Sequence, residues 1–350
     1  MKYFITIALA LLIILASIIG YRQNIFNIVT LPYDDEQIGL QEQIIIHFSH
    51  VVAENTPKGL AAAKFAELVK EKTNGRVLVQ VYPNGILYND ETELQALQKN
   101  EVQMIAPTFS KMTDLLPRWQ VLDLPFVFEN EQQIKSLYEK SELKTMLLDE
   151  LEQKKIKGLD FWHNGFKQIA ANEQLIRETG DFTSLRIRIM ASDLLRHQFQ
   201  LLDAVPITTS FGNVYYEIER KGVEAQENTI SNIYSKGFHT YEKNITLSNH
   251  GILGYAVLMN ESFWDSLDGE IQQHIMDALN EMRNWQFDVS VEINNDSLRE
   301  LESLPEVSIY SLTAEEKTEW KERLAPIYYY YEKEIDVTYY KLLLEHIENN

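Results

Sequence analysis

The feature that most constrains the fold is an alternation of short apolar runs with helical periods. Residues 44–49 form an apolar run typical of a buried strand, and Thr56-Pro57 then opens a stretch with helical spacing. Asn74-Gly75 marks a turn before a second strand-like run at 76–82. A strand–helix–strand unit has a right-handed crossover. It therefore predicts a parallel sheet with ligands at the carboxyl ends of its strands.

The alternation continues along the chain. Further strands are predicted at 102–106, 158–162, 185–190, 204–207 and 252–259. Helices are predicted at 91–98, at 132–155 as a pair, at 192–202 and at 214–221. From Asp268 a helical pattern extends for about thirty residues, which is long enough to span two lobes. The fold class is therefore α/β.

Composition excludes several functions. The 350 residues include 52 acidic and 32 basic side chains, and a formal charge of -20 repels nucleic-acid phosphates, so no nucleic-acid partner is expected. The chain has no cysteine, which excludes disulfides, thiol nucleophiles, thiolate metal sites and a lipid-modified N-terminal cysteine.

The N-terminus is typical of an export signal. Its uncharged apolar run, 3–21, is longer than the roughly 7–15 residues of a signal-peptide core and close to the roughly 20 that span a bilayer. Residues 1–22 are thus either a cleaved signal peptide or a retained membrane anchor. Residues 23–43 are polar and acidic, as in a tether, and the folded body begins at Ile44. Both alternatives place that body outside the cytoplasm.

Enzyme signatures are absent from the sequence. There is no Gly-x-Ser-x-Gly elbow, no phosphate-binding Gly-x-x-x-x-Gly-Lys and no Gly-x-Gly-x-x-Gly, so no cofactor is predicted. His47 and His50 would face opposite sides of a strand, which argues against a shared metal ion. Acidic pairs are abundant, and a carboxylate-pair hydrolase acting outside the cytoplasm stays an open alternative.

The informative side chains are cations and amides near predicted strand ends. Arg186 and Arg188 lie on one face of the strand at 185–190, and a buried arginine is costly unless it meets an anion such as a carboxylate. An Asn-Gly turn at 164–165 would hold Lys167 at the sheet edge. On these residues alone, salt bridges with the protein's own acids explain Arg186 and Lys167 equally well.

Five segments together resemble TRAP-type solute-binding proteins, and most closely their C4-dicarboxylate-binding branch. The resemblance covers about residue 44 to residue 335. The segments, in the family's order, are HFSHVVAENTPKG (47–59), WHNGFKQ (162–168), RIMAS (188–192), QENTISNIY (226–234) and NHGILGY (249–255).

The resemblance implies a two-lobed, periplasmic-binding-protein-like fold that closes on its ligand by a hinge motion. Crossing strands and the long helix after Asp268 would join the lobes. The implied division is lobe I at 44–162 and 251–290, and lobe II at 163–250 and 291–350.

The resemblance also implies a site. Arg188 matches the family's carboxylate-clamping arginine, Asn228 matches the asparagine that bonds the same carboxylate, and Lys167 stands where a lysine can meet the second carboxylate. His50 and Ser110 are further cleft candidates. Arg186 is then structural or peripheral. His163 replaces the family's usual aspartate and is expected in a solvated loop.

The implied function is capture of a small dicarboxylate for delivery to membrane transporter subunits, without catalysis. Two alternatives stay open. One is a membrane-anchored co-receptor that presents the ligand to a sensor kinase, and the other is an extracytoplasmic enzyme that acts on a carboxylate substrate.

Overall fold

The computed structural model describes residues 43–349 of the chain. The predicted export segment at 1–22, and the tether apart from Gln43, lie outside the described residues. Within residues 43–349, no helix is both long enough and apolar enough to cross a bilayer. Among the described residues, the first regular element is strand β1, which begins at Ile44.

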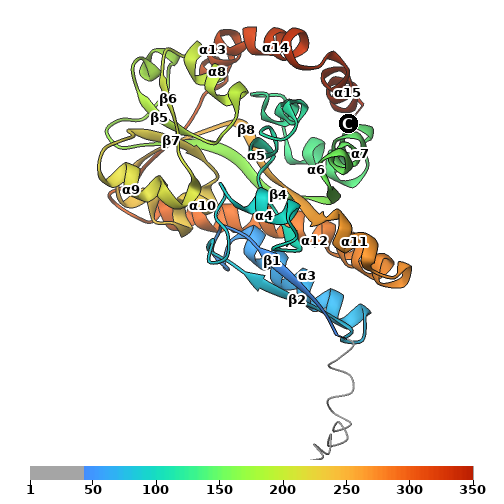
Figure 1. Ribbon diagram of the computed structural model, residues 1–350. Helices are drawn as coiled ribbons and strands as arrows, with labels where there is room; N and C mark the ends of the chain where they lie inside the picture. The colour runs from blue at the N-terminus through green and yellow to red at the C-terminus, as the bar shows by residue number, and fades with distance from the viewer. Residues whose placement is uncertain (1–42, 350) are drawn as a thin grey trace, which may run out of the picture. The chain divides into compact units, whose positions relative to one another are not determined.

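One mixed sheet forms the centre of the described structure (Figure 1). Its spatial order is β2-β1-β3-β8-β4-β7-β5-β6, and β9 pairs with β8. The strands are β1 (Ile44–Ser49), β2 (Val77–Tyr82), β3 (Met104–Ile105), β4 (Ile156–Ala171), β5 (Arg186–Ile189), β6 (Val205–Thr208), β7 (Ala225–Asn228), β8 (Asn244–Asn260) and β9 (Ser308–Ser311). Parallel strands lie on both sides of the β8–β4 pair: β2, β1 and β3 on one side, and β7, β5 and β6 on the other.

The predicted first strand–helix–strand unit is confirmed. Strands β1 and β2 are parallel and flank α3 (Pro57–Lys72). The Thr56 side chain caps α3 by accepting a hydrogen bond from Gly59 N at 3.2 Å, and Pro57 occupies the first turn, where its missing N–H costs nothing.

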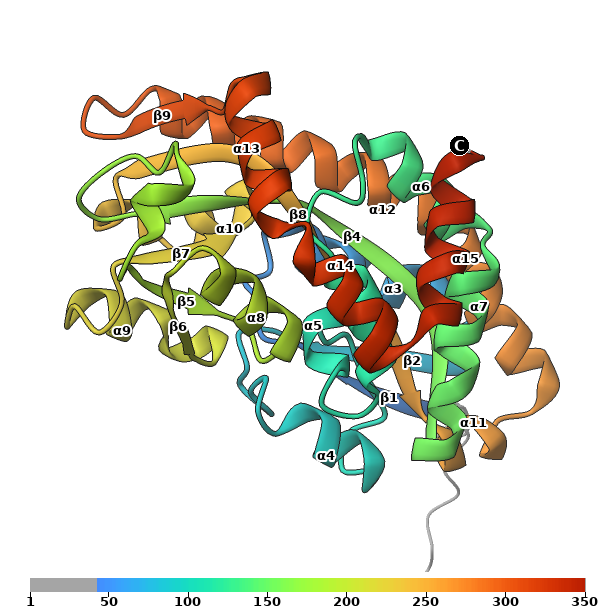
Figure 2. The ribbon, with the colours of Figure 1, turned by 90° about the horizontal axis from the view of Figure 1, so that it is seen from above.

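The long antiparallel strands β4 and β8 connect the two sets of parallel strands (Figure 2). The predicted turn at 164–165 is wrong, because β4 continues to Ala171. Gly165, with φ +127°, lies where the β4–β8 register shifts, so the glycine serves a bulge and not a chain reversal. A Cβ on Gly165 would come within 2.8 Å of Asn294 Nδ2. Lys167 consequently lies within a long buried strand and not at a sheet edge.

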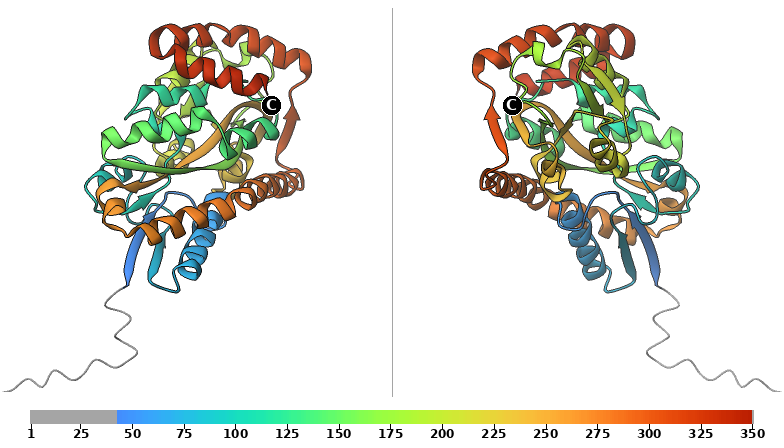
Figure 3. Two further views of the ribbon diagram at one scale, coloured as in Figure 1. Left: turned by 90° about the vertical axis from the view of Figure 1, so that its right-hand side faces the viewer. Right: turned by 90° about the vertical axis from the view of Figure 1, so that its left-hand side faces the viewer.

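The predicted long helix is confirmed as α12 (Gly269–Glu302). The Asp268 side chain caps it by accepting from Ile271 N at 2.8 Å. Helix α12 packs against α3 and β4, and also against α10 (Ile230–Ser235), which follows β7. It therefore contacts both halves of the sheet, as Figure 3 shows from two sides.

Other helices cover the remaining surfaces of the sheet. The C-terminal helices α13 (Ala314–Leu324), α14 (Pro326–Tyr330) and α15 (Val337–Glu348) run from α8 (Asp193–Leu201) to α7 (Glu142–Asp149) (Figure 2). The others are α4 (Glu93–Gln98), α5 (Phe109–Met112), α6 (Glu131–Glu139), α9 (Val214–Glu219) and α11 (Glu261–Ser266).

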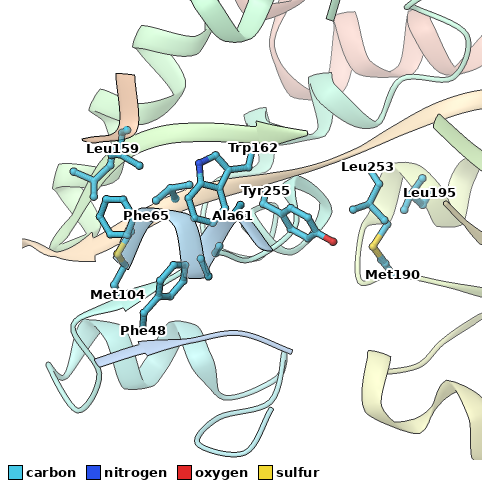
Figure 4. Packing of buried hydrophobic residues seen from close by; sticks show 14 of the residues in the cluster. Phe48, Ala61, Phe65, Met104, Leu159, Trp162, Met190, Leu195, Leu253 and Tyr255 are labelled. Atoms are coloured by element: carbon cyan, nitrogen blue, oxygen red, sulfur yellow. The ribbon is translucent and has the colours of Figure 1, made fainter. Parts of the chain in front are cut away.

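The core beside β1 is aromatic. Phe48, Phe65 and Trp162 are fully buried and contact one another with ring centroids 5.8–6.5 Å apart. Figure 4 shows Tyr255 beside this group, with its hydroxyl directed away from it, toward the side where Met190 and Leu253 lie. These packed rings support the strand ends from which the candidate site is built.

Candidate functional site

A cavity of about 240 Å³ lies where the carboxyl ends of the two sets of parallel strands meet. The loop after β1 contributes Val51 and Val52, and the segment from β3 to α5 contributes Thr108 and Lys111. From the other half come Arg188 on β5, residues 208–211 at the end of β6 and Asn228 at the end of β7. The location agrees with the rule that ligands bind beyond the carboxyl ends of parallel strands.

Arg188 is the cation that β5 supplies to the cavity. Its side chain is 2% exposed, and Nε and Nη2 donate to Thr209 O at 3.0 and 2.8 Å. Among residues 43–349 no carboxylate oxygen lies within the 4.0 Å of an ion pair with Arg188. Burial lowers the pKa of Arg188. The more distant acids Asp90, Glu227 and Glu242 act in the opposite direction but do not outweigh burial. The guanidinium is thus held in place by a carbonyl and available to an external anion.

Asn228 is held rigidly at the end of β7. Its Oδ1 accepts from Thr229 N at 3.0 Å and from Asn232 Nδ2 at 2.9 Å, and its Nδ2 donates to Gln226 Oε1 at 3.0 Å. An amide nitrogen carries two hydrogens, so Nδ2 has a second one for a ligand oxygen. The structure thus brings Arg188 and Asn228, both predicted site residues, to the same cavity.

Lys58 is a second buried cation in the cavity, and sequence reasoning missed it. Its side chain has no solvent exposure, Nζ donates to Ala106 O at 2.9 Å and lies 3.9 Å from the centroid of the Tyr255 ring. Like Arg188, it has no carboxylate within 4.0 Å among the described residues. The sequence contained one indication of this role. A lysine in the first turn of a helix is repelled by the positive end of the helix dipole, so its presence in α3 suggests a function other than helix stability.

Three acids also line the cavity: Asp90, Glu91 and Glu93. Glu93 is 1% exposed and its Oε2 has no hydrogen-bond partner in the described structure. Burial raises the pKa of Glu93 to about 7, although Lys58 opposes the shift. Asp90 Oδ2 accepts from Phe211 N at 2.8 Å, a bond between the segment after β2 and the segment after β6. The two halves therefore touch beside the cavity.

Comparison with known proteins agrees with this geometry. A family model described as "Bacterial extracellular solute-binding protein, family 7" matches residues 48–334. The chain belongs to this family. It is 44% identical to the C4-dicarboxylate-binding protein DctB of Bacillus subtilis, over 91% of this chain and 90% of DctB. It is 40% identical to the periplasmic protein DctP of Rhodobacter capsulatus, a C4-dicarboxylate-binding protein, over 83% and 86% of the two chains.

Solved structures show the same fold. A TRAP periplasmic solute-binding protein of Shewanella oneidensis with bound succinate superposes with a TM-score of 0.83 at 35% identity, covering 87% of this chain and 99% of that one. One from Pseudomonas aeruginosa with bound L-malate gives 0.80 at 31%, covering 82% and 100%. The predicted family and the two-lobed α/β fold are confirmed. As a member of an extracellular family, the protein works outside the cytoplasm.

Lys167 was predicted to bind the second carboxylate, but it does not line the cavity of this protein. Its Nζ donates to Glu227 Oε1 and Oε2 at 3.1 and 3.2 Å, and Glu227 also contacts His250 Nε2 at 3.1 Å. Glu227 and Asn228 are consecutive strand residues and face opposite sides of the sheet, and Lys167 lies on the Glu227 side. The structure gives Lys167 a protein partner, and its ligand role stays a prediction.

Ser110 and His50, the weaker candidates, also lie outside the cavity lining. Ser110 Oγ donates to Asp123 Oδ1 at 2.6 Å, although its neighbours Thr108 and Lys111 line the cavity. His50 is fully buried, and its two ring nitrogens have no hydrogen-bond partner in the described structure. Burial, aided by Lys58, lowers its pKa to about 3. It is neutral near the cavity and adds no positive charge.

Two further expectations concern residues outside the cavity. Arg186 pairs with Glu224 at 3.2 Å on a partly exposed surface, as expected of a structural residue. The expectation of a solvated His163 is wrong. It is fully buried in β4, stacks on Phe287 with ring centroids 4.4 Å apart, and its Nε2 lies 2.8 Å from Glu131 Oε2. The continuous strand, which replaces the predicted turn, carries it inward.

Proposed function

We propose that this protein captures a C4-dicarboxylate in the cavity between the halves of its sheet and delivers it to a membrane transporter. The observation that carries the proposal is Arg188, a buried guanidinium with no carboxylate partner within 4.0 Å in residues 43–349, aimed into a cavity large enough for a small acid. A buried charge is stable only with a counter-ion, and a ligand carboxylate fits the planar fork of arginine. The names of the relatives support the same ligand class.

The net charge of the chain does not oppose this role. A charge of -20 repels a dianion at long range, but salt screens exposed charges over roughly 8 Å at physiological ionic strength. The buried cations of the cavity therefore decide binding. Micromolar affinity, about 8 kcal/mol, would suffice for capture and release.

We propose binding without catalysis, and a transporter as the partner. The family comprises solute-binding proteins, and solved TRAP-type relatives hold succinate and L-malate as bound ligands. Neither the family description nor the names of these relatives mentions a sensor kinase, so the co-receptor alternative has no comparable support. Residues 1–22 are proposed to direct export. The mass of the mature protein isolated from its host would distinguish a cleaved signal peptide from a retained anchor.

A thermal-shift screen of small organic acids tests the proposal. A ligand that binds only the folded protein raises the melting temperature, so succinate, fumarate and L-malate should each raise it more than sugar acids or monocarboxylates do. Calorimetry should then give a saturating one-to-one isotherm, with the ligand recovered unchanged. Stabilisation by sugar acids alone, or conversion of the ligand, would overturn the proposal.

A further inference from the structure

Lys58 is the second buried cation in the cavity that has no carboxylate within 4.0 Å among the described residues. A negatively charged ligand group could bind beside it. Lys58 is fully buried, and its only hydrogen bond in the described structure goes to Ala106 O, a neutral acceptor. Nζ also lies 3.9 Å from the Tyr255 ring centroid, a cation–π contact that adds attraction without neutralising the charge. Burying an ammonium ion with so little compensation is costly, and an incoming carboxylate would reduce that cost.

An acid with an unpartnered oxygen lies in the same part of the cavity. Glu93 lines the cavity, is buried, and its Oε2 finds no donor among the described residues. Four charged or titratable groups interact electrostatically with Glu93. They are Asp90 before α4, Lys58 on α3, Lys111 on α5 and Tyr255 on β8. Lys111 already pairs with Asp114 at 2.7 Å. Lys58 is therefore the facing cation without an ion pair.

Burial disfavours the charge on both members of this pair. It raises the pKa of Glu93 to about 7 and lowers the pKa of Lys58 to about 8, and the attraction between them opposes both shifts. Near pH 7 Lys58 therefore carries its proton, whereas Glu93 is only partly protonated.

We propose that Lys58 binds the second carboxylate of the ligand, and that Glu93 takes up a proton from solvent as that carboxylate arrives. The inference rests on the proposed function, since it divides a dicarboxylate between Arg188 and Lys58. The proton is needed because an ionised Glu93 would repel the ligand and compete for Lys58. Protonated, Glu93 is neutral and its hydroxyl can donate to a ligand oxygen. Capture is then coupled to a change in protonation.

The coupling has a definite sign. A nearby ligand carboxylate raises the pKa of Glu93 further, so the complex binds more protons than the free protein does. Glu93 should thus contribute little to the pH dependence of affinity well below pH 7, where the acid is already protonated. It should fall as pH rises above about 7, by at most about tenfold per pH unit for one proton.

Calorimetry with a matched ligand pair tests the role of Lys58. Succinamate resembles succinate in size but replaces one carboxylate with a neutral amide. Lys58→Met should weaken succinate binding by at least about 30-fold, the loss typical of removing one partner of a buried charge pair. It should change succinamate binding by less than about threefold. Lys64→Met, on the same helix and paired with Glu67 at the surface, is the control and should leave both affinities unchanged.

Proton uptake can be measured without any variant that alters folding. Titration of wild-type protein with succinate at pH 7.0, in two buffers of different ionisation enthalpy, should show net proton uptake of less than one proton per ligand. Glu93→Gln, which cannot titrate, should lose most of the proton uptake at pH 7.0, and its succinate affinity should no longer fall as pH rises above 7.

These outcomes separate the inference from the proposed function. If wild-type protein fails to bind any dicarboxylate, the proposed function is wrong. If it binds succinate, but Lys58→Met retains the preference for succinate over succinamate or no proton is taken up, only the inference is overturned.

Discussion

Two groups of buried charge lie on opposite sides of strand β7, and they differ in how each cation is compensated. On one side Lys167 donates to both oxygens of Glu227, which His250 also contacts. On the other side Arg188 and Lys58 donate only to carbonyl oxygens. A compensated cation stabilises one closed arrangement, whereas an uncompensated cation beside a cavity is stabilised by a ligand. Burial alone therefore does not distinguish a candidate ligand-binding cation from a structural ion pair, whereas the presence or absence of a carboxylate partner within the protein does.

The largest expected effect comes from breaking the compensated group. Glu227→Ala removes the hydrogen-bonded acid of Lys167 and leaves only Asp123, 3.9 Å away, so it should lower the free energy of unfolding by about 3–5 kcal/mol. Glu224→Ala is the matched control, because Glu224 precedes the same strand but pairs with Arg186 at the surface, and it should cost less than about 1 kcal/mol. Urea denaturation measures both. Equal losses would mean that burial does not distinguish these pairs.

The next effect concerns ligand affinity. Arg188→Ala should weaken succinate binding by about 2–5 kcal/mol, because the bound carboxylate would lose its buried partner. Arg186→Ala, two residues earlier on the same strand, should change the affinity by less than about 0.5 kcal/mol. Calorimetry on folded variants measures the difference. Retained affinity in Arg188→Ala would remove this residue from the proposed site.

Acid should weaken the compensated group. Burial alone would raise the pKa of Glu227, but Lys167 and His250 overcome that effect and lower it to about 2. Its contribution to stability is therefore complete above pH 4.5, the reference value, and is lost as pH falls toward 2. The stability advantage of the wild type over Glu227→Gln should shrink by roughly 2 kcal/mol between pH 4.5 and pH 3. A constant difference in urea titrations across this range would contradict the ion pair.

The smallest expected effect tests whether Lys167 belongs to the ligand site at all. If Lys167 binds only the protein's own acids, Glu227 and the more distant Asp123, Lys167→Met should lower stability and leave the preference for succinate over succinamate unchanged, in contrast to Lys58→Met. A selective loss of succinate binding would instead support the role that the family resemblance implies for Lys167. Competition thermal-shift titrations of both variants would decide between the two lysines.

Features that depend on residues close together in the sequence could be predicted from it. The Thr56 and Asp268 caps, the parallel β1–β2 pair and the long helix α12 follow from local spacing and capping chemistry. The Asn-Gly signal at 164–165 failed, because pairing with β8 over most of β4 outweighed a local preference for a turn. The same error misplaced His163 in solvent.

By itself, the sequence determined the order of the elements and the family, and it predicted an arginine near a strand end as the anion-binding group. Only the tertiary structure decided which lysine faces the cavity. Lys58 reaches a carbonyl 48 residues away and Lys167 an acid 60 residues away. The energy of a buried charge depends on the groups that surround it in space, and the periodicity of the sequence does not predict which distant residues these are.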